Sequence, residues 1–123
     1  MVVIYIIATV AFSSCTYNKT VPQPAYALPE TVSFSKNLIP MFNQYCNTGG
    51  CHSTLSSTHL DLIDSVAYSS LFARHDVDTI NPSNSPLYVS MNSVNPTMPP
   101  SGRLSDYYVA LVLKWIKQKG RDN

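Results

Sequence analysis

The chain has 123 residues, which suits one domain of ordinary size. Only 12% of its residues are charged, about half the usual share, and the formal net charge is +1. The sequence has no basic patch and no run of like charges, which excludes the usual signatures of a nucleic-acid-binding protein and of a charged disordered tail.

The first segment in chain order is the most apolar one. Residues 1–12 (MVVIYIIATVAF) carry no charge, and Ser13 and Ser14 place small side chains directly before Cys15. The run is shorter than the roughly 20 apolar residues that a membrane-spanning helix needs. Residues 1–14 resemble a bacterial lipoprotein signal peptide, cleaved before a cysteine that is then acylated, although no Lys or Arg precedes Lys19. A plain secretory signal and an uncleaved anchor are the alternatives.

Residues 15–32 are predicted to form a tether. Pro22, Pro24 and Pro29 lie among Thr, Gln, Ala and Tyr without an apolar period. Such a composition favours an extended, polyproline-biased chain with no fold of its own. With Cys15 lipidated, the tether would hold the following domain, residues 33–123, away from a lipid bilayer.

Residues 33–123 are predicted to be all-α, with three to five helices joined by long loops. The first helix leads toward Cys46 and has an apolar residue every three or four positions: Phe34, Leu38, Phe42 and Tyr45. Pro40 is compatible with it only in or just after the first turn, because an interior proline clashes with the carbonyl four residues earlier. Short helices are also predicted over residues 65–73, capped by Asp64, and after Ser85-Pro86.

The last helix is the clearest of the predicted elements. Ser105 suits its N-cap and Gly120 the C′ position beyond its end. Its apolar face follows helical spacing: Tyr108, Leu111, Val112, Trp115 and Ile116. Met41 and Met91 also lie at helical spacing and are expected in the core. No strand alternation and no internal repeat is present.

One motif carries most of the chemistry: Cys46-Asn47-Thr48-Gly49-Gly50-Cys51-His52. It resembles the attachment site of a c-type haem, which usually has two residues between the cysteines where this chain has four. In such a site each thiol forms a thioether with the porphyrin, and the histidine offers a ring nitrogen to the iron. The two glycines are expected to let the longer loop bend back, because glycine reaches positive φ without steric cost.

A second candidate ligand, Met98, lies in the segment 96–100 (PTMPP). Flanking prolines restrict its backbone, which would hold a thioether sulfur rigidly. With the haem motif and the helix signals, residues 33–120 resemble a small monohaem cytochrome c domain of class I type, carried on a bacterial lipoprotein.

The resemblance implies one haem c attached through Cys46 and Cys51, with His52 and Met98 as axial ligands of the iron. It further implies an electron carrier, or a haem-bearing subunit of a redox chain, and not an enzyme. Such a protein is exported to the periplasmic side or the outer cell surface. Its partners would be a redox protein or a larger respiratory-type complex, and the lipid bilayer through Cys15.

Two alternatives come from other functional classes. The motif residues could bind a structural Zn²⁺ ion together with His59 or His75. A Cys46–Cys51 disulfide could instead stabilise an exported lipoprotein module without a redox role. His59 and His75 are also the alternatives to Met98 as the second axial ligand of an iron.

Overall fold

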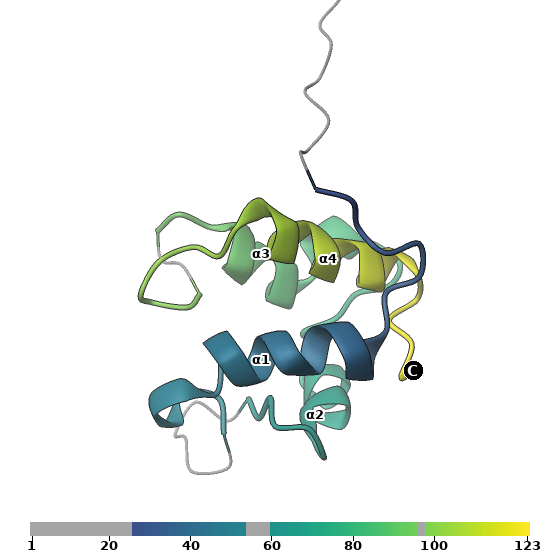
Figure 1. The fold of residues 1–123 in the computed structure, drawn as a ribbon. Helices are drawn as coiled ribbons and strands as arrows, with labels where there is room; N and C mark the ends of the chain where they lie inside the picture. Colours follow the sequence, from purple (N-terminus) through teal and green to yellow (C-terminus); the bar gives the residue numbers. More distant parts are fainter. Residues whose placement is uncertain (1–25, 54–59, 96–97) are drawn as a thin grey trace, which may run out of the picture.

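The computed structural model describes residues 26–53, 60–95 and 98–123, so the predicted signal peptide, Cys15 and His59 lie outside the described residues. Within these ranges the domain is all-α with four α-helices and no strand, as predicted (Figure 1). The helices are α1 (Ile39–Tyr45), α2 (Ala67–Ala73), α3 (Pro86–Asn92) and α4 (Asp106–Lys117). Three shorter turns are η1 (Phe34–Leu38), η2 (Thr48–Gly50) and η3 (Pro82–Asn84). None of the described helices has the length and hydropathy to cross a membrane.

A widened turn accommodates Pro40 at the start of α1. The preceding η1 is a π-helical turn, in which the Ile39 N–H donates to the Phe34 carbonyl five residues earlier. Pro40 then falls in the first turn of α1, directly after this wider turn. Ser33 caps η1, with its Oγ accepting from the Lys36 N–H at 3.2 Å. Helical turns therefore continue from η1 through α1 toward Cys46, and Pro40 lies at the junction of the two elements.

The bounds of α4 agree with the prediction, but its C-terminal cap is shifted by one residue. Ser105 is the N-cap by position, and its side chain makes no capping bond. Lys119 (φ 73) takes the C′ position and Gly120 (φ 52) the next one. The Lys119 N–H donates to Ile116 O and the Gly120 N–H to Trp115 O, both at 3.0 Å, which is a Schellman motif. The prediction of Gly120 at C′ was wrong because two successive residues, not one, adopt positive φ.

The core forms where α4 packs against η1. Trp115 is fully buried, and its ring centroid lies 5.1 Å from that of Phe34. The indole N–H is not left unpaired, since Nε1 donates to Arg121 O at 2.9 Å. Met41 and Met91 are both buried, as predicted. This packing holds α1 and α4 together and so fixes the segments that extend beyond them.

Part of the segment assigned to the tether packs against the domain. Val32 is 1% exposed, and its N–H donates to Gln118 Oε1 at 2.9 Å. Gln118 Nε2 in turn donates to Glu30 O at 2.7 Å, and Tyr26 makes an edge contact with Tyr107. The packed domain therefore begins before residue 33.

Candidate functional site

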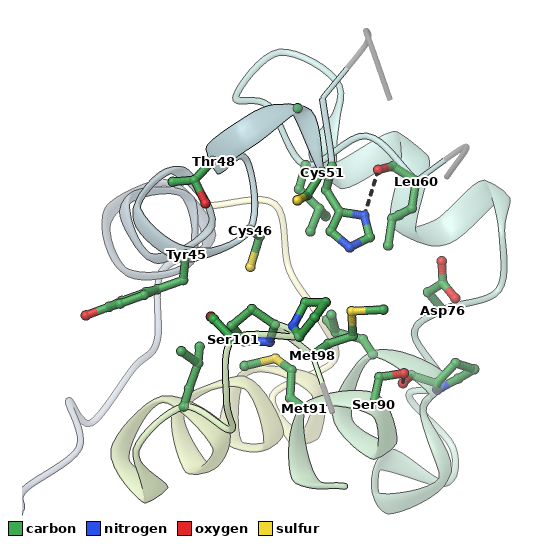
Figure 2. Close-up of a pocket in the computed structure, with 18 residues that line it drawn as sticks. Tyr45, Cys46, Thr48, Cys51, Leu60, Asp76, Ser90, Met91, Met98 and Ser101 are labelled. Atoms are coloured by element: carbon green, nitrogen blue, oxygen red, sulfur yellow. Dashed lines mark hydrogen bonds between the residues drawn. The ribbon is translucent and has the colours of Figure 1, made fainter. Parts of the chain in front are cut away.

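The structure brings the four predicted haem-binding residues to one cavity. Cys46, Cys51 and His52 line it from the motif loop, and Met98 lines it from the segment that precedes α4. Figure 2 shows Cys46 and Cys51 on one side of the cavity and Met98 on the opposite side. These residues are up to 52 positions apart in the sequence, so the fold and not chain proximity unites them.

The cavity has the size and lining of a site for a large, mostly apolar ligand. Its volume is about 680 Å³, within the range of roughly 300–1,000 Å³ typical of small-molecule and cofactor sites. Apolar side chains contribute much of the wall: Leu60, Leu62, Leu87, Met91, Pro99 and Leu104. A planar macrocycle with a hydrophobic body would be desolvated favourably in such a space.

The motif loop folds back through its two glycines, as predicted. Gly49 (φ 64) and Gly50 (φ 74) both adopt the left-handed conformation, in which a side chain would be strained. The loop closes through two backbone bonds, from the Cys51 N–H to Thr48 O at 3.3 Å and from the His52 N–H to Cys46 O at 3.1 Å. The longer spacing between the cysteines is thus accommodated within a compact turn, and both cysteines still reach the cavity.

The orientation of the His52 ring is set by a backbone carbonyl. His52 Nδ1 lies 3.1 Å from Leu60 O, the contact drawn as a dashed line in Figure 2. A carbonyl oxygen only accepts hydrogen bonds, so Nδ1 is the donor in this contact, and a neutral ring then has its lone pair on Nε2. This is the tautomer in which Nε2 can bind a metal while the second nitrogen is held by an outer partner.

The two cysteines are thiols in the structure and differ in their surroundings. Cys51 is exposed, whereas Cys46 is partly buried beside the cavity. Burial, and to a smaller extent the nearby Cys51, raises the pKa of the Cys46 thiol to about 11. Cys46 is therefore a neutral thiol at physiological pH, as suits a side chain that faces an apolar wall.

Met98 is docked onto the last turn of α3. Its N–H donates to Ser90 O at 3.1 Å. Because α3 ends at Asn92, the Ser90 carbonyl is one of the four that lack a partner within the helix. The Met98 N–H supplies that partner and so fixes the backbone of the loop. Met91 lines the same wall of the cavity (Figure 2), so a second thioether lies within this site.

A polar network behind the motif was not predicted from the sequence. Asn47 Nδ2 donates to Leu62 O at 2.9 Å and to Asn43 Oδ1 at 2.8 Å. Asn43 Nδ2 donates to Asp64 Oδ1 at 2.8 Å, so Asp64 serves this network and does not cap α2, whose N-cap is Val66. The Leu62 N–H donates to His52 O at 2.8 Å. The network thereby joins the segment at Leu62 to the motif. The spacing of Asn43 and Asn47, four residues apart, is the one sequence signal that could have indicated it.

Of the two alternative ligands, His59 and His75, only His75 lies within the described residues. His75 is exposed at a left-handed position (φ 60) after α2 and does not line the cavity. Asp76, which does line it, forms an ion pair with Arg74 at 3.3 Å. Across residues 26–53, 60–95 and 98–123, no three His, Cys, Asp or Glu side chains are grouped so that they could hold a metal ion. A zinc site made of the motif residues and His75 therefore has no support.

Comparisons with protein-family profiles, with curated proteins and with solved structures find no significant match to this chain.

Proposed function

We propose that the protein is a c-type cytochrome that transfers electrons through one covalently bound haem. The observation that carries the proposal is the convergence of Cys46, Cys51, His52 and Met98 on a single cavity of about 680 Å³. Two thiols and an imidazole on one side, with a thioether opposite, form the donor set that attaches and ligates a haem c.

The residues that line the cavity suit a haem chemically, which supports the proposal. Its wall is mainly apolar, as the porphyrin body requires, and Leu60 O holds Nδ1 of His52, so Nε2 is the nitrogen that would bind the iron. Cys46 and Cys51 would hold the porphyrin by one edge, while His52 and Met98 would ligate the iron. When bound, the haem would supply an iron that alternates between Fe(II) and Fe(III).

The proposed ligands and the apolar wall of the cavity indicate which role a bound iron would have. His52 and Met98 would both bind the iron as protein ligands, so the proposed role is electron transfer and not catalysis. A thioether ligand favours Fe(II) and raises the potential relative to two histidines. The apolar wall from Leu60, Leu87 and Leu104 would exclude water and act in the same direction. The partner is proposed to be another redox protein, bound through a small transient contact.

The first experiment is to express the full chain together with a cytochrome c maturation system. The expected result is a protein with sharp Soret and α bands whose haem stays attached after denaturation. The double variant Cys46→Ser with Cys51→Ser should lose the covalent haem. A colourless wild-type protein would refute the proposal; if it contained zinc or a Cys46–Cys51 disulfide, the corresponding alternative would replace it.

A second experiment distinguishes the two thioethers that line the cavity. In the oxidised protein a bound methionine sulfur gives a weak near-infrared charge-transfer band. Met98→Ala should abolish this band and lower the potential, whereas Met91→Leu, which keeps the volume of a buried side chain, should retain both. The opposite pattern would assign the ligand to Met91, and a bis-histidine spectrum in the wild type would point to His59 or His75.

A further inference from the structure

Arg103 ties together the two ends of the connection that carries Met98. Its Nη1 lies 2.6 Å from Asp106 Oδ1, and its Nη2 donates to Asn92 Oδ1 at 2.9 Å. Asn92 is the last residue of α3, and Asp106 is the first residue of α4. One guanidinium therefore bridges the helix before Met98 and the helix after it.

The bridge lies close to the attachment of Met98 itself. The Met98 N–H is bonded to Ser90 O, two residues before Asn92 in the same last turn of α3. On the other side, the neighbour of Arg103, Leu104, is buried and lines the cavity. Arg103 thus holds the last turn of α3, where the methionine is docked, against the beginning of α4.

We propose that Arg103 is a positioning residue that keeps the Met98 sulfur on the iron; this inference rests on the proposed function. A thioether is a weak ligand, and Met98 is 40% exposed, so burial secures its side chain only in part. The strength of ligation then depends on how firmly the two ends of its loop are held. Arg103 supplies that constraint without touching the haem-binding cavity.

The geometry requires an arginine and not merely a positive charge. Nη1 and Nη2 address two acceptors on different helices at the same time, which the planar fork of a guanidinium allows. A lysine ammonium is a point charge on a flexible stem and would satisfy Asp106 or Asn92 with less constraint. Arg103→Lys is therefore expected to recover only part of the function that Arg103→Ala removes.

The test measures how easily an added ligand displaces Met98 from the oxidised, haem-containing full chain. Imidazole is titrated into wild type, Arg103→Ala and Arg103→Lys, and into Lys36→Ala as a control that removes one positive charge from η1. Because the bridge is partly exposed, its loss should raise the apparent affinity for imidazole about three- to tenfold. Arg103→Lys should fall between wild type and Arg103→Ala, and Lys36→Ala should match the wild type.

A second readout, exchange of the Met98 backbone amide, reports on the loop directly. Its exchange should accelerate by a similar factor in Arg103→Ala, while exchange of the core amides of Trp115 and Ile116 stays unchanged. Equal imidazole affinity in wild type and Arg103→Ala, with haem attached in both, would overturn the inference and leave the proposed function intact. Failure of the wild type to bind haem would refute the proposed function itself, and the two failures are therefore distinguishable.

Discussion

Asn47 should contribute to stability through its position behind the motif loop. In Asn47→Ala the bonds from Nδ2 to Leu62 O and to Asn43 Oδ1 are both lost. Asn43 is exposed, so water can replace the donor there, whereas the Leu62 carbonyl is held against the motif by the adjacent bond from the Leu62 N–H to His52 O. In Asn47→Asp the introduced carboxylate can only accept hydrogen bonds, so its negative oxygen faces the carbonyl oxygen of Leu62, which is also an acceptor. Asn84→Ala, at an exposed position of η3, serves as the control.

The expected magnitudes follow from what each change leaves unpaired. Losing the partly buried bond to Leu62 O and leaving that oxygen unpaired costs about 2 kcal/mol. Removing Asn47 Oδ1, a buried oxygen that has no hydrogen-bond partner in the structure, recovers about 1 kcal/mol. Asn47→Ala should therefore lower the free energy of unfolding by about 1 kcal/mol, and the Tm by about 4–8 °C for a domain of this size. Asn47→Asp should lower the free energy by about 3 kcal/mol, because a charge is left facing an acceptor.

The pH dependence separates this explanation from a loss of packing. The introduced carboxyl of Asn47→Asp can donate to Leu62 O only when protonated, which raises its pKa in the folded state above the unfolded value of about 3.9. The destabilisation is then fully present well above the folded pKa, and it disappears as the pH falls toward the unfolded pKa.

Thermal unfolding of the full chain, followed by far-ultraviolet circular dichroism at about pH 7 and about pH 5, measures both effects. Asn47→Asp should gain stability relative to the wild type at the lower pH, and Asn47→Ala should not. Equal stability of Asn47→Asp and Asn47→Ala at both pH values would refute the reasoning.

Two further predictions concern the ends of the domain. Lys119→Gly should raise the free energy of unfolding by about 1 kcal/mol, because Lys119 lies at φ 73 in a region that glycine adopts without a Cβ penalty. Gly120→Ala should lower the free energy of unfolding by about 1–2 kcal/mol, since φ is 52 and an added Cβ would lie 3.1 Å from the Phe72 ring. Denaturant midpoints measure the effect of both substitutions, and unchanged midpoints would contradict the Schellman cap. Cys15→Ser should move the haem protein from the membrane to the soluble fraction, because several acyl chains anchor a protein that one would not. Wild-type protein that is already soluble and lacks residues 1–14 would exclude lipidation.

The fold was predictable where one residue pattern determines one element. The apolar spacing of α4 and the Ser85-Pro86 signal of α3 predicted helices that begin at the observed residues, because local propensity and burial agree there. The π-helical turn before Pro40 was not predicted, since a proline marks a break in helical bonding without specifying which turn precedes it. Asp64 was assigned to α2 because acceptors commonly cap helices; its carboxylate instead meets Asn43, which only the tertiary structure brings near.

The candidate site likewise has a part that the sequence predicted and a part that it did not. The motif from Cys46 to His52 is contiguous in sequence, and the positive φ of Gly49 and Gly50 was expected from their residue type within the longer loop. The partners that orient this motif could not be predicted. Leu60 offers a backbone carbonyl to His52, a role that any residue type could fill and that leaves no mark in the sequence.

The two sides of the cavity are therefore held by different means, which has a consequence for function. His52 is fixed by bonds to Cys46, Leu60 and Leu62, all within ten positions of His52 in the sequence. Met98 depends on its bond to Ser90 and on the bridge that Arg103 makes between α3 and α4. Releasing Met98 breaks few contacts, whereas releasing His52 breaks the bonds that hold the motif loop together. If an iron is bound as proposed, ligand exchange should therefore begin at Met98, and changes around Arg103 should adjust the potential while the haem stays attached.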